Sequence, residues 1–256
     1  MNYFNLKGMN IMVTGAAGHL GSAISMGLAE HNAKVFLNGR NKNKLLKLKK
    51  KIDAAKLSSE IAHFDIENFD EVKNFFLKIK KLDILVNNAY HGKPGTFENS
   101  SLGDYKESFN INILALSNLV DQSLPLLKKS KNASIINISS LYGSIIPDPN
   151  LYENTALNNP PHYGVAKAAL EHYGKYASVN LAKYGIRVNT ISPGPFPSKT
   201  IIKKFPKFIK KLKKKNPLNK IGKPQDIITS ILFLSSPNSS FVTGSNIPVD
   251  GGWKLW

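Results

Sequence analysis

Three side chains in the second half of the sequence could together exchange a proton with a substrate. Tyr163 and Lys167 are four residues apart in "YGVAK", so they would share one face of a helix. A phenol with a reference pKa of about 10 is a poor acid–base catalyst at neutral pH, and a nearby ammonium group favours the phenolate. Ser140, in "INISS", could hydrogen-bond the same substrate oxygen. Because Ser140 lies 23 residues before Tyr163, the fold must bring the two together.

The elements that could do so alternate along the chain. Short segments rich in Ile or Val, ending at Gly, Asn, Asp or Ser, predict strands at "NIMVTG", "KVFLNG", "IAHFD", "DILVNNA", "ASIINISS" and "IRVNTISPG". Helices are expected over residues 18–31, 42–57, 68–81, 104–129 and 161–184. Continuous apolar strands separated by helices predict a mainly parallel sheet with helices on both faces. We therefore expect residues 1–256 to form a single doubly wound, Rossmann-type α/β domain.

A glycine turn joins the first predicted strand to its helix. "VTGAAGHLGSAI" places Gly15, Gly18 and Gly21 there, where a backbone free of side chains and the amides of a helix N-terminus can face a pyrophosphate. Glycine also serves ordinary turns, but this position between strand and helix favours dinucleotide binding. Arg40 ends the second strand, where an acidic residue would bind a ribose diol. It suits the 2′-phosphate of NADP. The alternative is that Arg40 is an ordinary surface residue and that the cofactor is NAD.

The composition excludes several classes of protein. The 256 residues include no cysteine, so neither disulfides nor thiolate metal sites can form. The formal charge is +18, but only two of the 35 basic residues are arginine, the side chain that nucleic-acid sites favour. No cluster of histidines and carboxylates indicates a metal. With no signal-peptide pattern and no apolar run of membrane-spanning length, we expect a cytoplasmic protein without nucleic acid, metal or membrane span.

Six motifs, in order, resemble the short-chain dehydrogenase/reductase family over nearly the full chain. They are "TGAAGHLG", "NNA" at 87–89, "INISS", "YGVAK", "RVNTISPGP" and "VTGSNIPVDGG". The resemblance implies a sheet of about seven strands, within the usual range for sheets. It also implies an NAD(P)-dependent oxidoreductase that acts on a small-molecule substrate and assembles as a homo-oligomer, a tetramer or a dimer.

The resemblance assigns roles to single residues. Tyr163 would exchange a proton with the substrate oxygen, and Lys167 would hold the nicotinamide ribose and lower the pKa of the tyrosine. Ser140 would hydrogen-bond the substrate. It is preferred to Ser139 because the family usually places this serine three residues before a glycine, here Gly143.

Further residues are implied around these three. Asn112, in "FNINIL", matches the asparagine that supports a proton-relay water, which completes the catalytic set. The residues implied for the cofactor are Gly15, Gly18, His19, Leu20, Gly21, Arg40, Asp65, Ile66, Asn88, Ala89, Tyr163, Lys167, Pro193 and Gly194. Two departures affect the shape of the site, because His19 and Tyr90 stand where glycine is usual. Tyr90 and His91 are candidate substrate residues, although an ordinary loop histidine is the alternative for His91.

Residues 144–161, here called the substrate loop, fall outside the strand–helix alternation. Their prolines exclude a continuous helix, and their asparagines suit turns. The loop leaves the sheet edge where ligands of α/β sheets bind, and Tyr152, Glu153 and Asn154 offer a ring and hydrogen-bonding groups suited to a sugar. A subset of the family linked to bacterial surface-sugar and flagellin modification has a similar insertion. The alternative is a surface ornament or a subunit contact.

Residues 199–215, here called the lid, are rich in lysine and correspond to the mobile lid of the family. Ile and Phe side chains could form one apolar face with lysines opposite. Pro206 predicts that no long regular helix spans the segment. The lysines could be a solvated face, attract an anionic substrate or lie on a membrane surface.

The sequence thus predicts an NADP-preferring oxidoreductase that interconverts a secondary alcohol and a ketone, with a sugar, sugar nucleotide or polyol as substrate. A reductase of 3-oxoacyl-acyl-carrier-protein thioesters is the alternative within enzymes, since a basic surface suits an acidic carrier. A regulator that binds NADP without turnover is the alternative outside them, and the intact Ser140, Tyr163, Lys167 and Asn112 disfavour it.

Overall fold

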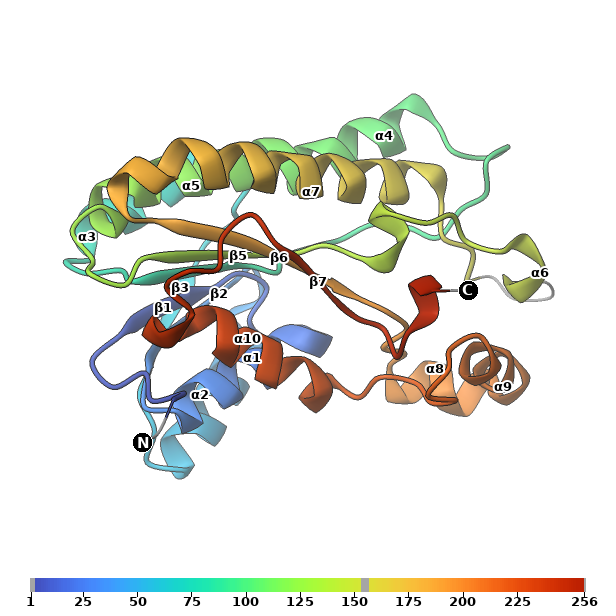
Figure 1. Ribbon diagram of the computed structural model, residues 1–256, viewed down its shortest axis with the longest axis horizontal. Helices are drawn as coiled ribbons and strands as arrows, with labels where there is room; N and C mark the ends of the chain where they lie inside the picture. The colour runs from blue at the N-terminus through green and yellow to red at the C-terminus, as the bar shows by residue number, and fades with distance from the viewer. Residues whose placement is uncertain (1–2, 153–156, 256) are drawn as a thin grey trace.

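The computed structural model describes residues 3–152 and 157–255, which form one parallel sheet of seven strands (Figure 1). The spatial order is β3-β2-β1-β4-β5-β6-β7, so the winding reverses between β1 and β4. The predicted α/β fold is confirmed, and the reversal is where doubly wound sheets bind ligands. Five of the six predicted strand segments contain a strand, the sixth, "IAHFD", overlaps β3, which begins two residues earlier, and a seventh strand lies in the C-terminal motif. The strands are β1 (Asn10–Val13), β2 (Lys34–Gly39), β3 (Ser59–His63), β4 (Ile84–Asn87), β5 (Ser134–Ile138), β6 (Arg187–Pro193) and β7 (Asn246–Val249).

Helices cover both faces of the sheet (Figure 1). Those on one face are α1 (His19–Glu30), α2 (Lys42–Ala54) and α10 (Ile228–Ser235), and those on the other are α3 (Phe69–Lys78), α4 (Leu102–Phe109), α5 (Ala115–Leu127) and α7 (Pro161–Leu181). The remaining helices, α6 (Pro149–Tyr152), α8 (Lys199–Lys204) and α9 (Pro206–Lys214), lie together at one end of the sheet. Asparagine caps fix two helix starts, because the side chains of Asn41 and Asn68 accept hydrogen bonds from the third helical amide of α2 and α3.

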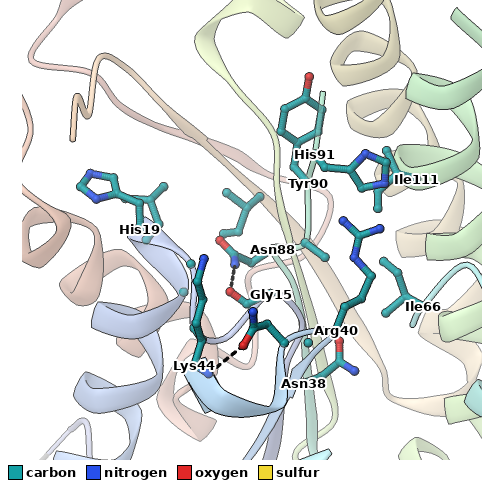
Figure 2. Close-up of a pocket in the computed structure, with 18 of the residues that line it drawn as sticks. Gly15, His19, Asn38, Arg40, Lys44, Ile66, Asn88, Tyr90, His91 and Ile111 are labelled. Atoms are coloured by element: carbon teal, nitrogen blue, oxygen red, sulfur yellow. Dashed lines mark hydrogen bonds between the residues drawn. The ribbon is translucent and has the colours of Figure 1, made fainter. Parts of the chain in front are cut away.

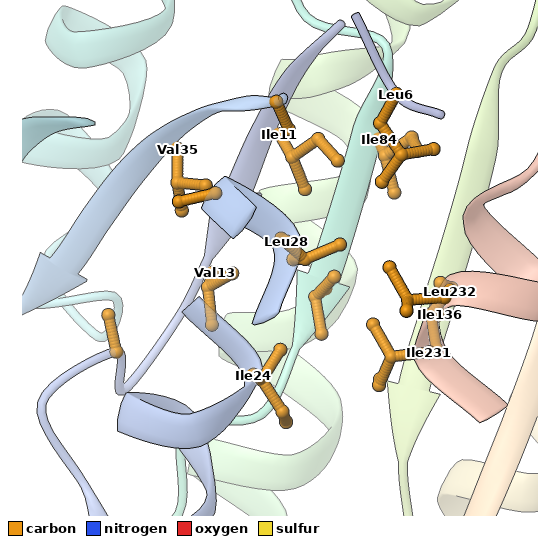
Figure 3. Packing of buried hydrophobic residues seen from close by; sticks show 14 of the residues in the cluster. Leu6, Ile11, Val13, Ile24, Leu28, Val35, Ile84, Ile136, Ile231 and Leu232 are labelled. Atoms are coloured by element: carbon orange, nitrogen blue, oxygen red, sulfur yellow. The ribbon is translucent and has the colours of Figure 1, made fainter. Parts of the chain in front are cut away.

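Two hydrophobic cores lie on the two faces, because successive strand side chains point in opposite directions. On β1, Ile11 and Val13 belong to the core shared with α1, α2 and α10, and Met12 belongs to the core shared with α3, α5 and α7. Figure 3 shows Ile24 and Leu28 of α1 packing on the first face. This two-sided burial fixes the strands rigidly, and their carboxyl ends then position the pocket.

The prediction of a single helix over residues 104–129 was wrong, because the structure has two helices there, α4 and α5. The capping box of Ser101 and Asp104 starts α4 two residues earlier than expected, and a π-helical turn at Asn110–Leu114 separates α4 from α5. Such turns are frequent at functional sites, and this one contains Asn112. The expected helix over 161–184 is α7 followed by a 3₁₀ turn that ends at Gly185, whose φ of +71° is left-handed.

The substrate loop and the lid pack against each other in a third hydrophobic cluster. Pro206 separates α8 from α9, which confirms that no long helix spans the lid. The buried members of the cluster are Leu141, Tyr142, Leu151, Tyr152, Phe208, Ile209, Leu212 and Trp253. In the described part of the chain, no helix is both long and apolar enough to cross a bilayer.

Candidate functional site

A pocket opens at the carboxyl ends of the strands and brings most of the predicted site residues together (Figure 2). Its lining comes from the glycine turn, the ends of β2, β4, β5 and β6, and the start of α7. The predicted residues that line it are Gly15, Gly18, His19, Leu20, Gly21, Arg40, Asp65, Ile66, Asn88, Ala89, Tyr90, His91, Ser140, Tyr163, Lys167, Pro193 and Gly194. Residues spread over most of the sequence therefore share one cavity.

The glycine turn needs its glycines for steric reasons. Gly15 has a φ of +62°, and a Cβ there would lie 3.0 Å from the Ala89 Cα. A Cβ on Gly21 would collide with the Gly15 carbonyl oxygen, so α1 can pack closely on the turn only with glycine at that position. The turn consequently presents bare backbone to the pocket.

The N-terminus of α1 faces the pocket without a side chain that caps it. Gly18 precedes the helix, no side chain hydrogen-bonds the first amides, and the first turn has no acidic residue. Free amides and the positive end of the helix dipole suit an anion. The chain's own residues therefore fit the pyrophosphate of a dinucleotide.

Thr14 ties the turn to the end of β4, a role that the sequence analysis missed. Its hydroxyl oxygen accepts hydrogen bonds from the backbone amides of Asn88 at 2.9 Å and Ala89 at 3.0 Å. The Asn88 side-chain amide donates to the Thr14 carbonyl at 2.9 Å and to the Gly15 carbonyl at 3.3 Å. Asn88 thus holds the glycine turn in place besides lining the pocket.

Ser140 and Tyr163 meet despite the long loop between them. Ser140 lies two residues past the end of β5 and Tyr163 in the first turn of α7, and both line the pocket. Burial raises the pKa of the Tyr163 phenol, and the neighbouring Ser140 side chain opposes that rise. The pair can hold a substrate oxygen and exchange its proton.

Lys167 lies one helical turn after Tyr163 and is buried. Its Nζ donates to the Ile138 carbonyl oxygen at 2.9 Å and lies 5.9 Å from the centre of the Tyr163 ring. Burial lowers the pKa of Lys167 to about 7, and the nearby Glu171 carboxylate opposes that fall. Burial outweighs the other influences on the phenol, so the Tyr163 pKa lies above its ordinary value, and the lowering of this pKa by Lys167 stays a prediction.

Glu171 is a second residue that the sequence analysis missed. It accepts hydrogen bonds from the hydroxyls of Ser139 at 3.1 Å, Ser192 at 3.0 Å and Ser144 at 3.0 Å. Ser139 follows β5, Ser192 belongs to β6 and Ser144 begins the substrate loop. One carboxylate therefore joins three segments next to Lys167. The signal was available, because Glu171 is four residues after Lys167 on the same helix face.

Arg40 is surrounded by carboxylates at the far end of the pocket. Its Nη1 lies 3.7 Å from Asp65 and 4.0 Å from Glu67, and more than half of its side chain is exposed. Lys44 also lines the pocket, and Figure 2 shows it apart from Arg40, with Gly15 between the two in the view. Lys44, on the first turn of α2, is a cation of this region that the motif comparison did not include.

His91 contacts two carboxylates. Its Nε2 lies 2.7 Å from Glu67 and its Nδ1 lies 3.4 Å from Glu107. Burial raises the pKa of Glu67, but hydrogen bonds from His91 and Asn110 outweigh it, so this pKa lies below its usual value. His91 thus lines the pocket while joining the end of β4 to α4.

Asn112 and Tyr152 are not among the described residues that line this pocket. Asn112 is buried in the π-helical turn, where its amide donates to the Ser108 carbonyl at 2.8 Å. The Tyr152 ring is buried against Phe208, 5.4 Å between ring centres, and its hydroxyl hydrogen-bonds that of Tyr142 at 2.6 Å. Tyr152 therefore packs the substrate loop against the lid. The sequence analysis had placed it among the substrate residues. Glu153 and Asn154 lie outside the described residues.

Comparisons with known proteins agree with this geometry. A family model described as enoyl-(acyl carrier protein) reductase matches residues 15–254. The 7alpha-hydroxysteroid dehydrogenase of Paraclostridium sordellii is 34% identical over 253 residues, covering 95% of this chain and 91% of the relative. The 3-oxoacyl-[acyl-carrier-protein] reductase FabG of Rickettsia conorii is 31% identical over 251 residues, covering 98% and 99%. A solved complex of Pseudomonas aeruginosa RhlG with NADP has a TM-score of 0.88 at 27% identity and covers 99% of each chain.

Proposed function

The chain belongs to the short-chain dehydrogenase/reductase family and is an oxidoreductase of alcohols and ketones, and we propose that it is an NADP-preferring member acting on a sugar, a sugar nucleotide or a polyol. One observation carries the proposed chemistry. Ser140 and Tyr163, with Lys167 one turn away, line the same pocket as the glycine turn. A proton donor and a dinucleotide cradle therefore face one cavity.

In the proposed reaction, Tyr163 delivers a proton to the carbonyl oxygen of a ketone, or removes one from the alcohol. Ser140 holds the same oxygen by a hydrogen bond. Bound NADPH supplies the hydride to the carbonyl carbon. Lys167 provides positive charge beside the phenol, and Asn112 supports the proton path from within the π-helical turn.

NADP is proposed over NAD because of the charges beside the end of β2. Arg40 and Lys44 would hold the adenosine 2′-phosphate, while the bare glycine turn and the α1 N-terminus would hold the pyrophosphate. The similar RhlG chain binds NADP. Asp65 and Glu67 favour the NAD alternative, because these carboxylates lie next to Arg40 and would repel a phosphate bound there.

The proposed sugar-like substrate rests on two side chains that follow β4. Tyr90 offers a ring and His91 an imidazole at the lining of the pocket, and rings with adjacent hydrogen-bonding groups suit polyhydroxylated ligands. A 3-oxoacyl-acyl-carrier-protein reductase is the second candidate. The matched family model and the Rickettsia relative favour it, as do the lysines of the lid, which would attract an acidic carrier.

We further propose a cytoplasmic homo-oligomer, a dimer or a tetramer. Val165, Tyr176 and Val179 lie on one face of α7 and are exposed, as is Leu114 between α4 and α5 on the same side of the sheet. An exposed apolar stripe on adjacent helices suits a symmetric contact between copies. Size-exclusion chromatography with light scattering measures the assembly.

The test of the proposed function is a substrate panel. Sugars, sugar nucleotides, polyols and acyl thioesters are mixed with the protein and NADPH or NADP, and nicotinamide absorbance is followed. We expect turnover of a sugar-like compound that Tyr163→Phe abolishes. Turnover of acyl thioesters alone would support the second candidate. Cofactor binding with no turnover anywhere on the panel would support the regulator and contradict the enzyme.

A further inference from the structure

The side chain of Tyr90 occupies the pocket directly beside the catalytic pair. It follows Ala89 at the end of β4, lines the cavity and keeps 38% of its surface exposed (Figure 2). Its hydroxyl lies against Gly92, where a Cβ would collide with the phenol oxygen. The absence of a side chain at Gly92 therefore makes room for this orientation of the Tyr90 ring.

The Tyr90 ring contacts both Tyr163 and Lys167. Its centre lies 5.0 Å from the centre of the Tyr163 ring, with the planes at 63°, an edge-to-face arrangement. The Lys167 Nζ lies 5.3 Å from the centre of the Tyr90 ring and 5.9 Å from that of Tyr163. An ammonium within about 6 Å of a ring centre is attracted by the π face. The Lys167 ammonium thus lies within reach of both aromatic rings.

We propose that Tyr90 is a positioning residue, whose ring stabilises the charged form of Lys167 and fixes the Tyr163 ring for proton transfer. This inference rests on the proposed roles of Tyr163 and Lys167. It gives a function to the residue that stands where glycine is usual in the family. The ring replaces part of the hydration that the buried ammonium has lost.

The groups facing Lys167 set the direction of the effect. Glu171 on α7 and the π faces of Tyr90 and Tyr163 favour the ammonium, whereas burial disfavours it and lowers the pKa to about 7. Around Tyr90 itself, burial raises the phenol pKa, and Tyr163 and Glu107 raise it further, so this phenol stays neutral at physiological pH. The Tyr90 hydroxyl is dispensable in this role, and the ring is not.

The test follows the titration of Lys167 directly, in the full chain without added cofactor or substrate. Lysine labelled with ¹³C at Cε reports protonation by NMR, and a Lys167→Met spectrum identifies the signal. We expect Tyr90→Phe to keep the wild-type midpoint, because the ring remains. Tyr90→Leu should lower the midpoint by about one pH unit, the size of a desolvated cation–π contact. A midpoint in Tyr90→Leu that is unchanged or raised overturns the proposal.

Two further variants keep the result interpretable. Tyr184→Leu is the matched control, because Tyr184 also contacts a lysine, Lys128 at 3.8 Å, but on the surface. It should leave the Lys167 midpoint unchanged. If Tyr90→Leu does not fold, as judged by circular dichroism, Tyr90→Met removes the π face while keeping a bulky apolar side chain, and the same criterion applies.

The substrate panel described above then separates the proposed role of Tyr90 from the proposed function of the protein. With a substrate in hand, Tyr90→Leu should lower kcat more than it raises KM, and should move the alkaline limb of the pH profile toward lower pH. Tyr90→Phe should restore both. If the panel shows no turnover, the proposed function fails while the NMR midpoints still decide whether Tyr90 stabilises charged Lys167.

Discussion

Two regions at the carboxyl ends of the strands differ in what fixes their geometry: the cofactor half, which lines the pocket, and the substrate half, in which the substrate loop and the lid pack beside it. In the cofactor half, built by the glycine turn and the ends of β2 and β4, backbone groups determine the shape. Gly15 adopts a left-handed φ, Gly21 packs against the Gly15 carbonyl, and Thr14 accepts two backbone amides from β4. Few side-chain choices satisfy such constraints, so they leave a spaced signature in the sequence.

In the substrate half, the substrate loop and the lid pack on each other beside Tyr163, and side chains hold these two insertions together. Tyr152 packs on Phe208 and hydrogen-bonds Tyr142, and Lys211 donates to the Asn150 carbonyl at 2.8 Å. Many other pairs of side chains could make equivalent contacts. The comparison teaches that sequence motifs reveal the part of the molecule that the backbone builds, and reveal less of the part that side chains build.

The largest expected effect is on chemistry at the boundary between the halves. Tyr163→Phe keeps the ring and its contact with Tyr90 but removes the proton donor. We expect kcat to fall by about 10²–10⁴-fold, with NADPH affinity, measured by fluorescence titration, close to that of the wild type. A matching loss of cofactor affinity would mean that the two halves are not separable at this residue.

The cofactor half should tolerate no added atom at its turn. In Gly21→Ala the new Cβ would collide with the Gly15 carbonyl, and overpacking of this kind costs about 1–3 kcal/mol. We expect lower stability in urea unfolding together with weaker NADPH binding. Gly103→Ala on α4 is the control, because its Cβ would meet Ser101 at an ordinary 3.4 Å. Equal behaviour of the two variants would contradict the steric argument.

The same distinction explains how much could be predicted. The strands and the faces they bury follow from periodicity, because a buried parallel strand must be apolar throughout. The π-helical turn at Asn110–Leu114 could not be predicted, since local propensity does not distinguish it from a continuous helix. The position of Tyr152 was also missed, because whether a loop tyrosine faces a ligand or a partner segment depends on packing that no local pattern encodes.

Charged neighbours of the site were missed for a related reason. Lys44 lines the pocket, and Glu67 contacts the lining residues Arg40 and His91. The significance of both positions appears only when the strands are aligned in the sheet. Their sequence environment is ordinary: a lysine in a lysine-rich helix and an acid in a turn. Glu171 is the exception, because its spacing from Lys167 could have revealed it.

Cofactor choice sharpens the comparison within the cofactor half. Arg40→Asp replaces a cation beside Asp65 and Glu67 with a third carboxylate, so NADPH affinity should fall by roughly 10–100-fold, the size of a charge-assisted hydrogen bond. NADH affinity should change little. Lys47→Asp, exposed on α2, makes the same change in net charge and should affect neither cofactor. If the loss were equal for NADPH and NADH, Arg40 would not be selecting the phosphate.

The buried Lys167 predicts a dependence of stability on pH. Its folded pKa of about 7 lies below the ordinary 10.5, so between these values the unfolded chain binds more protons and the free energy of unfolding rises with pH. The destabilisation is fully present below pH 7. From pH 7 to 9.5, the stability of the wild type should gain on that of Lys167→Met by at most about 1.4 kcal/mol per pH unit. Urea unfolding at several pH values measures the difference, and a constant difference would argue against a buried, titrating lysine.

The smallest effect is expected where the substrate half meets solvent. Asp148 in the loop contacts Lys215 after α9, Oδ2 to Nζ at 2.7 Å, and this hydrogen bond lowers the pKa of the carboxyl group. Exposed ion pairs contribute little and are screened by salt, so Asp148→Asn should leave overall unfolding nearly unchanged. Local opening of the lid is more sensitive, because it breaks only the contacts between loop and lid and leaves the rest of the fold intact. We expect trypsin to cut within residues 199–215 roughly twofold faster, with the acceleration disappearing at high salt.

Asp70→Asn, on the exposed face of α3, makes the same charge change far from the lid and should leave the cleavage rate unaltered. If both variants accelerated cleavage equally, net charge and not the contact between loop and lid would control the opening.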